Sequence, residues 1–274
     1  MDPGEHFAIT LSNPLKNYTP FFESENAVIF IGDCLEILGS VPEDSIDMIF
    51  ADPPYMLSNN GFTCQNGKMV NVNKGKWDKS NGFENDTIFH NEWVSACRRI
   101  LKPEGTIWIS GTYHSIYQCG YILQKNNFHF LNDIIWFKPN ASPNLSCRFF
   151  TASHETIIWA RKDKNAKHTF NYDEMKNGLF PEDKLKKENS QMRSVWSITS
   201  PKIEEKEYGK HPTQKPLDLL KRIVLASTNV NDIILDPFCG SGTTGVACKC
   251  LKDRFFIGIE TDKNYCNLAK TRLS

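Results

Sequence analysis

The sequence lacks the features of membrane-spanning and secreted proteins. No apolar run approaches the length of about 20 residues that a spanning helix requires. The N-terminus has no basic segment followed by an apolar stretch, which is the pattern of a secretory signal. The nine cysteines lack the C-x-x-C or Cys/His spacing of a zinc site, and the closest pair is Cys248 and Cys250. We therefore expect a cytoplasmic protein with reduced thiols and no metal.

The sequence also lacks a net charge, since it has 32 basic and 32 acidic side chains among 274 residues. This balance excludes a strongly basic chain, which is the simplest indication of a nucleic-acid partner. The charges are nevertheless distributed unevenly. Residues 1–60 contain one base and ten acids, whereas residues 161–222 contain 15 bases and 10 acids. The zero is therefore an average over an acidic beginning and a more basic later part.

Seven short apolar runs are typical of buried parallel strands, because turn or acidic residues bound them. They cover residues 27–31, 46–51, 106–110, 132–137, 156–160, 232–235 and 254–259. Helical patterns cover residues 91–101, 216–228, 243–251 and 262–273. This alternation predicts an α/β fold, a doubly wound, mostly parallel sheet of seven strands with helices on both faces. The length fits a single domain over residues 1–274.

Two segments interrupt this alternation. Residues 57–82 are rich in Asn, Gly, Ser and Lys and are typical of a long mobile loop, which in a compact α/β protein is usually functional or disordered. Residues 161–209 are polar with mixed charge, which predicts an insertion packed outside the sheet. Both segments are candidates for contacts with a substrate, although they also fit plain surface loops.

The tetrapeptide Asp52-Pro53-Pro54-Tyr55 directly follows the predicted strand 46–51. Ligands of open α/β sheets bind beyond the carboxyl ends of the strands, so a site is expected here. The two prolines fix the backbone and remove two N–H donors, which leaves the Asp52 carboxylate and the Pro53 carbonyl as acceptors beside an aromatic ring. This combination suits a planar ligand with an exocyclic amine. A tight turn with a surface tyrosine remains the alternative.

A Gly-rich segment, Asp236 to Thr244 (DPFCGSGTT), follows the predicted strand 232–235 and precedes a helix. Its glycines let the backbone approach a ligand, and the helix N-terminus offers N–H donors. It is not a phosphate-binding P-loop, because the lysine of that motif is absent. Glu260 ends the next strand, where an acid is placed to bond the hydroxyls of a ribose. Asp33 also lies between a strand and a helix. A purely structural role as the N-cap of that helix is the alternative to ligand binding here.

Together these motifs resemble those of the DNA amino-methyltransferases that use S-adenosylmethionine. The order, with the D-P-P-Y tetrapeptide first and the Gly-rich loop last, is that of their β class. Three further segments are similar to parts of that class: HPTQKP at 211–216, WFKPN at 136–140, and the stretch from Arg148 to Glu155. Within the class, SPNLSCRFF and HETIIWARK look most like the second methyltransferase of DpnII-type restriction–modification systems, which act on GATC.

The resemblance implies a Rossmann-like methyltransferase sheet and a role for each matching residue. The catalytic residues it implies are Asp52, Pro53, Pro54 and Tyr55. The cofactor-binding residues it implies are Asp33, Lys215, Asp236, Phe238, Gly240, Ser241, Gly242, Thr243 and Glu260. Contacts with DNA are expected from Lys76, Trp77, Asn140 and Arg148. The domain would comprise a catalytic half over about 27–160, a small target-recognition insertion over about 161–209 and a cofactor-binding half over about 210–274.

The reaction expected from these roles is methyl transfer from S-adenosylmethionine to the N6 amine of an adenine flipped out of duplex DNA. Tyr55 would stack on the adenine, and Phe62 or Trp77 would help to close the site. Methylation of cytosine N4 is the nearest alternative, followed by an RNA or protein-amide methyltransferase and by a DNA-binding module without catalysis. The expected partners are DNA, a second copy of the chain in a homodimer and a cognate restriction endonuclease of the same system.

Overall fold

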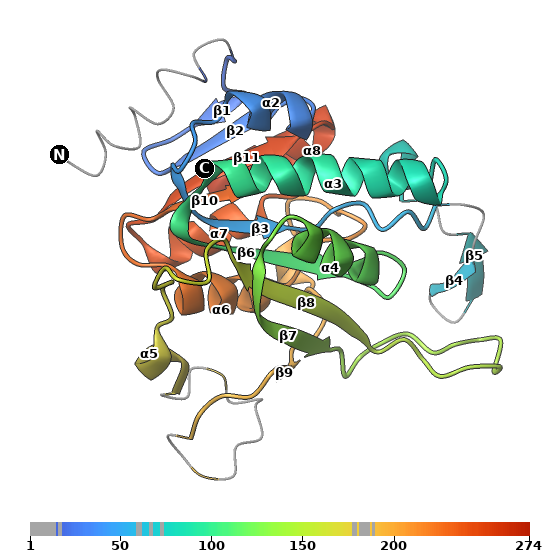
Figure 1. Cartoon of the computed structure of the whole chain (residues 1–274). Helices are drawn as coiled ribbons and strands as arrows, with labels where there is room; N and C mark the ends of the chain where they lie inside the picture. Colours follow the sequence, from blue (N-terminus) through green and yellow to red (C-terminus); the bar gives the residue numbers. More distant parts are fainter. Residues whose placement is uncertain are drawn as a thin grey trace.

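The structure is a computed structural model, and it describes residue 15, residues 18–58, 74–176, 180, 187 and 190–274. For residues 62–65, 68–71 and 76 it describes the backbone alone. Within these residues a central sheet has the strand order β1-β2-β11-β10-β3-β6-β8-β7-β9 (Figure 1). Its strands are β1 (Phe22–Glu23), β2 (Ala27–Ile31), β3 (Ile46–Ala51), β6 (Leu101–Gly111), β7 (His129–Phe137), β8 (His154–Arg161), β9 (Val195–Ser197), β10 (Ile233–Asp236) and β11 (Phe255–Glu260).

The predicted doubly wound, mostly parallel sheet is confirmed. Strands β2, β11, β10, β3 and β6 are mutually parallel, whereas β8 runs antiparallel to both β6 and β7. Each of the seven predicted apolar runs lies within a strand or extends beyond it by one residue, and the strands in the middle of the sheet, such as β3 and β10, bury side chains on both faces. The short strands β1 and β9 extend the sheet at its two edges, to nine strands in the described residues.

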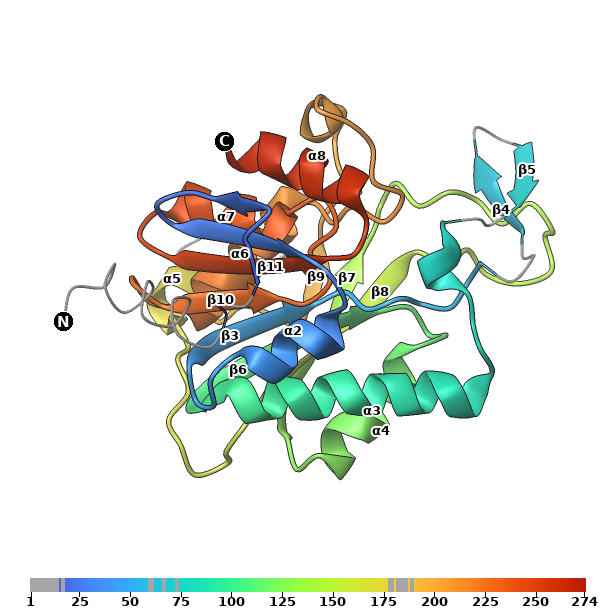
Figure 2. The ribbon, with the colours of Figure 1, turned by 90° about the horizontal axis from the view of Figure 1, so that it is seen from above.

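Helices cover both faces of the sheet (Figure 2). On one face lie α2 (Cys34–Ser40), α3 (Phe83–Ile100) and α4 (Ile116–Lys125). On the other lie α6 (Leu217–Ser227), α7 (Thr243–Leu251) and α8 (Lys263–Leu273), and the short α5 (Tyr172–Lys176) contacts α6. A separate cluster of buried apolar side chains lies between the sheet and each of the two helical layers. Among the described residues, no helix combines the length and apolar composition needed to cross a membrane.

The structure differs from the sequence expectations in four places. Helix α3 begins at Phe83, well before residue 91, because Asp86 in its first turn accepts hydrogen bonds from Asn81 N and the Ser80 hydroxyl. Helix α4 was not predicted. The segment 57–82 contains the hairpin of β4 (Phe62–Gln65) and β5 (Lys68–Asn71) and the 3₁₀ helix η1 (Lys76–Asp78). The segment 161–209 is not wholly outside the sheet, because β9 pairs with β7.

The described cysteines agree with the expected free thiols. None of the eight described cysteines forms a disulfide, and six of them are buried. Cys97 and Cys239, for example, pack in the clusters on opposite faces of the sheet. These side chains therefore behave as small core residues.

Candidate active site

One cavity of about 210 Å³ lies at the carboxyl edge of the sheet. Its wall includes Asp33 after β2, Asp52 after β3, Gly240 after β10 and Glu260 at the end of β11. A smaller cavity of about 30 Å³ adjoins it and also contains Asp52 and Gly240 in its wall. The D-P-P-Y tetrapeptide and the Gly-rich loop, which are far apart in sequence, thus line the same space.

The backbone of the Gly-rich loop explains two of its glycines. Gly240 and Gly242 have φ angles of 50° and 74°, in the left-handed region that favours glycine. A Cβ atom on Gly242 would lie 2.9 Å from the Cβ of Ala269 on α8. The Gly240 N–H donates to Glu260 Oε2 over 2.9 Å, so the predicted ribose acid also holds the loop.

Arg272, near the end of α8, fixes the other side of this loop. Its Nη1 donates to the Ser241 carbonyl over 2.7 Å and to the Thr243 hydroxyl over 2.9 Å. Ser241 and Thr243 are nearly fully buried and line the smaller cavity with Lys215. The loop is therefore held in place by both β11 and α8.

Asp236 is a buried carboxylate at the beginning of the loop. Its oxygens accept hydrogen bonds from Phe238 N over 3.0 Å and from the Thr244 hydroxyl over 2.5 Å. Burial raises the pKa of Asp236 to about 7, and these two hydrogen bonds oppose the rise. Burial also raises the pKa of Glu260. A cation bound in the adjacent cavities would relieve this cost of burying acids.

Asp33 acts as the N-cap of α2, since its Oδ1 accepts from Leu35 N over 2.8 Å and from Glu36 N over 3.4 Å. The same residue lines the larger cavity. Capping fixes the orientation of the carboxylate, so the capping and ligand-binding interpretations of Asp33 are compatible.

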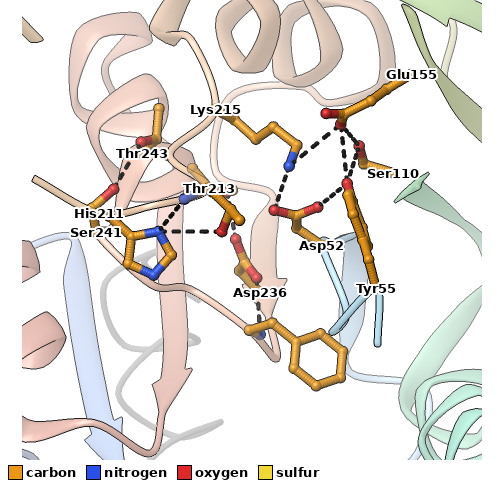
Figure 3. Close-up of polar contacts among 12 residues, drawn as sticks. Asp52, Tyr55, Ser110, Glu155, His211, Thr213, Lys215, Asp236, Ser241 and Thr243 are labelled. Carbon is orange, nitrogen blue, oxygen red and sulfur yellow. Dashed lines mark hydrogen bonds and ion pairs between the residues drawn. The ribbon is translucent and has the colours of Figure 1, made fainter. Parts of the chain in front are cut away.

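The catalytic tetrapeptide belongs to a buried polar cluster (Figure 3). The Tyr55 hydroxyl donates to Asp52 Oδ1 over 2.6 Å and lies 3.0 Å from Glu155 Oε2 and 3.2 Å from the Ser110 hydroxyl. Lys215 Nζ lies 2.5 Å from Asp52 Oδ2 and 3.5 Å from Glu155 Oε2. The side chains come from the loop after β3, from β6, from the start of β8 and from the segment before α6.

The charges in this cluster balance, since Asp52 and Glu155 face Lys215 and Lys138, whose Nζ lies 2.5 Å from Glu155 Oε1. Burial raises the pKa of Asp52, with a contribution from Glu155, and Lys215 opposes this rise. Burial alone would also raise the pKa of Glu155, but Lys215 and Lys138 lower it to about 2. Glu155 is therefore ionised, and Asp52 is the carboxyl that takes up a proton first.

The ring of Tyr55 is covered in this structure, with only 5% of the residue exposed. Lys74 Nζ lies 5.7 Å from the ring centroid and Lys215 Nζ lies 5.2 Å from it. Asp78, at the end of η1, accepts from Tyr55 N over 3.0 Å and from the Ser58 hydroxyl over 2.8 Å. The segment around η1 thus packs directly against the tetrapeptide.

Three aromatic side chains from separate segments line the larger cavity. Trp77 of η1 stacks on His211 with ring centroids 6.3 Å apart, and Tyr265 of α8 meets His211 edge-on at 4.2 Å. All three line the cavity. Burial, with the nearby charge of Lys215, lowers the pKa of His211 to about 4, so its ring is neutral at neutral pH. Trp77 therefore lies at the cavity that also contains the predicted cofactor-binding residues.

The other residues expected to contact DNA lie further out. Asn140 and Arg148 are exposed on the segment between β7 and β8, and Asn140 Oδ1 accepts from Ser200 N over 3.2 Å. The side chains of Lys76 and Phe62 lie outside the described part of the chain. The structure thus brings Trp77 together with the predicted catalytic and cofactor residues, but not Asn140 or Arg148.

Sequence reasoning missed Glu155, His211 and Arg272 as site residues. Glu155 stands just before the apolar run of its strand, and His211 begins the HPTQKP segment, so both had a signal in the sequence. Arg272 lies on the last helix and has no such signal, because only the packing of α8 against the loop reveals it.

Comparisons with known proteins agree with this geometry. The family model described as DNA methylase (N6_N4_Mtase) matches residues 46–271. The Type II methyltransferase M2.LlaDCHI of Lactococcus lactis subsp. cremoris is 50% identical over 256 residues, which are 93% of this chain and 92% of that protein. M2.DpnII of Streptococcus pneumoniae is 48% identical over 255 residues, again 93% and 92% of the two chains.

Solved structures show the same fold. The crystal structure of the M1.HpyAVI–SAM complex superposes with a TM-score of 0.66 at 32% identity, over 90% of this chain and 99% of that one. The cytosine-N4-specific PvuII DNA methyltransferase superposes with a TM-score of 0.73 at 20% identity, over 94% and 89% of the two chains. The matching family model, the extent of the relatives and the shared site motifs lead to one conclusion: the chain belongs to the N6/N4 DNA methylase family and is a DNA methyltransferase.

Proposed function

We propose that this enzyme transfers a methyl group from S-adenosylmethionine to the N6 amine of an adenine flipped out of duplex DNA, within GATC. The observation that carries the proposal is that Asp52 and Pro54 line the same cavity as Asp33, Gly240 and Glu260. A methyl donor held by the Gly-rich loop would therefore face a target base held by the tetrapeptide. The relative M1.HpyAVI, which has been crystallised with SAM, supports the choice of donor.

The charges of the site support a cationic donor. Asp33, Asp52 and Glu260 surround the larger cavity, and Asp236 lines the smaller one. S-Adenosylmethionine carries a sulfonium and an ammonium group, and both would be attracted to such acids. In this proposal Glu260 bonds the ribose and Asp33 the adenine of the donor. Phe238, Ser241, Gly242 and Thr243 hold its methionine end.

Lys215 lines the smaller cavity, where its ammonium group can pair with the carboxylate of the donor. Its ion pair with Asp52 supports an additional role at the tetrapeptide.

The chemistry then needs only positioning. The Asp52 carboxylate and the Pro53 carbonyl accept hydrogen bonds from the N6 amine, which orients the nitrogen lone pair towards the sulfonium methyl. The N–C bond forms as the C–S bond breaks, the thioether leaves, and the nitrogen then loses a proton. Holding two bound reactants in line is worth up to about 7–11 kcal/mol of the barrier. Because Lys74 and Lys215 both lie over the ring of Tyr55, stacking of the base on this ring requires a lysine to move.

Methyl transfer to DNA from labelled S-adenosylmethionine tests the proposal. Asp52→Ala should abolish methylation while the donor still binds, because Asp52 is only one of several acids around the donor cavity. Equilibrium binding of S-adenosylhomocysteine, measured by calorimetry, is the control for folding. Near-normal methylation by Asp52→Ala would refute the assigned role.

Cytosine N4 is the second candidate target, because both bases offer similar amines and the PvuII enzyme has the same fold. Asp52 favours adenine by resemblance, since serine is commoner at this position in N4 enzymes. Mass spectrometry of nucleosides from digested product DNA separates N6-methyladenine from N4-methylcytosine. Single-molecule sequencing of the same DNA identifies the recognition sequence and tests GATC.

The remaining assignments concern recognition and partners. In this proposal residues of about 161–209, together with Lys76, Asn140 and Arg148, contact the DNA around the target, while about 27–160 and 210–274 form the catalytic and cofactor halves. The enzyme would act in the cytoplasm beside a cognate restriction endonuclease. Sedimentation of the free and DNA-bound enzyme tests the homodimer.

A further inference from the structure

Glu155 occupies an unusual place for a functional side chain in this fold. Strand β8 runs antiparallel to its neighbours, so its first residues arrive at the edge where β3 and β6 end. Only 10% of the Glu155 side chain is exposed, and its Oε2 lies 3.0 Å from the Tyr55 hydroxyl and 3.5 Å from Lys215 Nζ. Glu155 itself lines neither of the two cavities.

We propose that Glu155 is a positioning residue for methyl transfer, which acts through Tyr55 and Lys215 to hold the Asp52 carboxylate towards the target amine. The proposal rests on the proposed function, because it assumes that Asp52 faces the amine. Tyr55 has one hydroxyl proton and two carboxylate acceptors within reach, Asp52 Oδ1 at 2.6 Å and Glu155 Oε2 at 3.0 Å, so the position of its oxygen depends on both carboxylates. The Ser110 hydroxyl lies 3.2 Å from the same oxygen and donates to Glu155 Oε2 over 3.3 Å, so it joins Tyr55 to Glu155.

Lys215 gives Glu155 a second path to Asp52. The ammonium group lies between the two carboxylates, closer to Asp52 than to Glu155. With Glu155 neutralised, this ammonium and the Tyr55 hydroxyl lose one of their fixed neighbours, and both move relative to Asp52. Because a misplacement of about 1 Å can cost about a hundredfold in rate, small movements here have measurable effects.

The test compares Glu155→Gln with Lys138→Met in single-turnover methylation of a DNA duplex by saturating donor. Lys138 contacts Glu155 Oε1, on the side away from Tyr55, so its loss removes an ion pair of Glu155 without touching the contacts in question. Glu155→Gln should lower the rate about tenfold to a hundredfold. Lys138→Met should lower it less, and both variants should bind S-adenosylhomocysteine as the wild type does.

A pH profile separates positioning from a purely structural ion pair. The charged and titratable groups around Asp52 are Tyr55, Lys74, Lys138, Glu155, His211, Lys215 and Asp236, together with Asp33, Glu260 and Tyr265, which line the same cavity. The charge of Glu155 raises the pKa of Asp52, so its removal should move the acidic limb of the rate profile to lower pH. A wild-type rate, or a lower rate with an unmoved limb, would overturn the proposal.

The double variant Glu155→Gln/Lys138→Met keeps the cluster neutral and covers the case in which Glu155→Gln does not fold. It should show the same loss of rate with unchanged donor binding, and a wild-type rate would again count against Glu155. A product carrying N4-methylcytosine would refute the proposed target without affecting this comparison, since the two results come from different measurements.

A second, independent observation concerns the arm formed by residues 138–153, which connects β7 to β8. In both ribbon views it projects from the same end of the molecule as the β4–β5 hairpin (Figures 1 and 2). Near its tip Phe149 is 68% and Phe150 98% exposed. Removing such apolar area from water is favourable, which favours a partner that covers it.

The tip of the arm is folded rather than extended. Asn144 N donates to the Thr151 hydroxyl over 3.3 Å, and Asn144 Nδ2 donates to the Phe149 carbonyl over 2.8 Å. Cys147, with a φ of 54°, turns the chain just before Arg148. Two exposed apolar rings and an exposed cation, Arg148, are therefore consecutive residues at this turn.

We infer that Phe149 and Phe150 stack on DNA bases that lose their neighbour when the target base is flipped out, while Arg148 contacts a phosphate. Apolar side chains inserted between base steps are a general way for proteins to stabilise opened DNA. The inference rests on the base-flipping step of the proposed function. Both ends of the arm lie at the catalytic cluster, because Lys138 begins it and Glu155 lies two residues beyond its last residue.

Fluorescence of a duplex with 2-aminopurine at the target position tests this contact. Because aromatic–base stacking is worth about 1–3 kcal/mol, Phe149→Ala/Phe150→Ala should bind the duplex about fivefold to a hundredfold more weakly. It should also give a smaller rise in fluorescence. Tyr117→Ala is the matched control, since Tyr117 is 76% exposed on α4. Wild-type affinity and fluorescence in the double variant would overturn the inference, whereas a wild type that binds without a fluorescence rise would refute flipping itself.

Discussion

Asp236 offers a sharp test of how the site treats buried charge. Only 2% of this residue is exposed, and burial raises the pKa of its carboxyl from 3.8 to about 7. The folded state therefore binds more protons than the unfolded chain between these pH values. The free energy of unfolding consequently decreases as pH rises through this window. The full difference corresponds to about 4 kcal/mol, of which about 2–3 kcal/mol falls between pH 5 and pH 8.

The perturbation is Asp236→Asn, which has nearly the same shape and cannot ionise. The amide can still accept from Phe238 N, while its NH₂ faces the Thr244 hydroxyl, so the altered hydrogen bond is a cost that does not change with pH. The variant should therefore gain stability relative to the wild type by about 2–3 kcal/mol on going from pH 5 to pH 8.

Urea unfolding of the protein without donor, at both pH values, measures this difference. Asp218→Asn, at an exposed position on α6, is the control. An equal difference at both pH values, or a relative loss at pH 8, would refute the reasoning.

Three further predictions concern the contacts that shape the site. Arg272→Met should weaken donor binding about tenfold in calorimetry, because it removes charged hydrogen bonds, worth about 1.5–3 kcal/mol each, from the Gly-rich loop. Gly242→Ala should lower the free energy of unfolding by about 1–3 kcal/mol in urea titrations, since its φ is 74° and α8 occupies the space of the new methyl group. Asp78→Ala should cost about 1–3 kcal/mol, because it leaves the N–H of Tyr55 unpaired, and methylation should slow as well. Unchanged binding, stability or rate, respectively, would contradict each of these.

The sheet could be predicted because its strands carry the strongest local signal. Runs such as Ala27–Ile31 and Ile46–Ala51 are buried on both faces, and their observed bounds are those of the apolar runs. The direction of β8 could not be predicted in this way. An apolar run has the same composition in either direction, so only its pairing with β6 and β7 shows that it is antiparallel.

The same limit explains what was missed in the site. Asp52 and Glu260 follow the rule that ligands bind beyond strand ends, so their sequence positions indicated a site. Glu155 precedes most of its strand, and that rule finds it only once the reversal of β8 is known. The contact of Lys74 with the ring of Tyr55 is likewise a tertiary contact between two loop segments, and no periodic sequence pattern predicts it.

The pairing of Phe137 with His154 gives the arm a property of its own. Its two ends are neighbours in the hydrogen-bonded ladder, so a longer, shorter or foreign segment can replace residues 139–152 without shifting a strand and without removing Lys138, the ion-pair partner of Glu155. Doubling the length of such a closed loop costs only about 0.6 kcal/mol of chain entropy. This part of the molecule is therefore modular, and an exchange of arms between relatives would leave the chemistry in place while changing the surface offered to DNA.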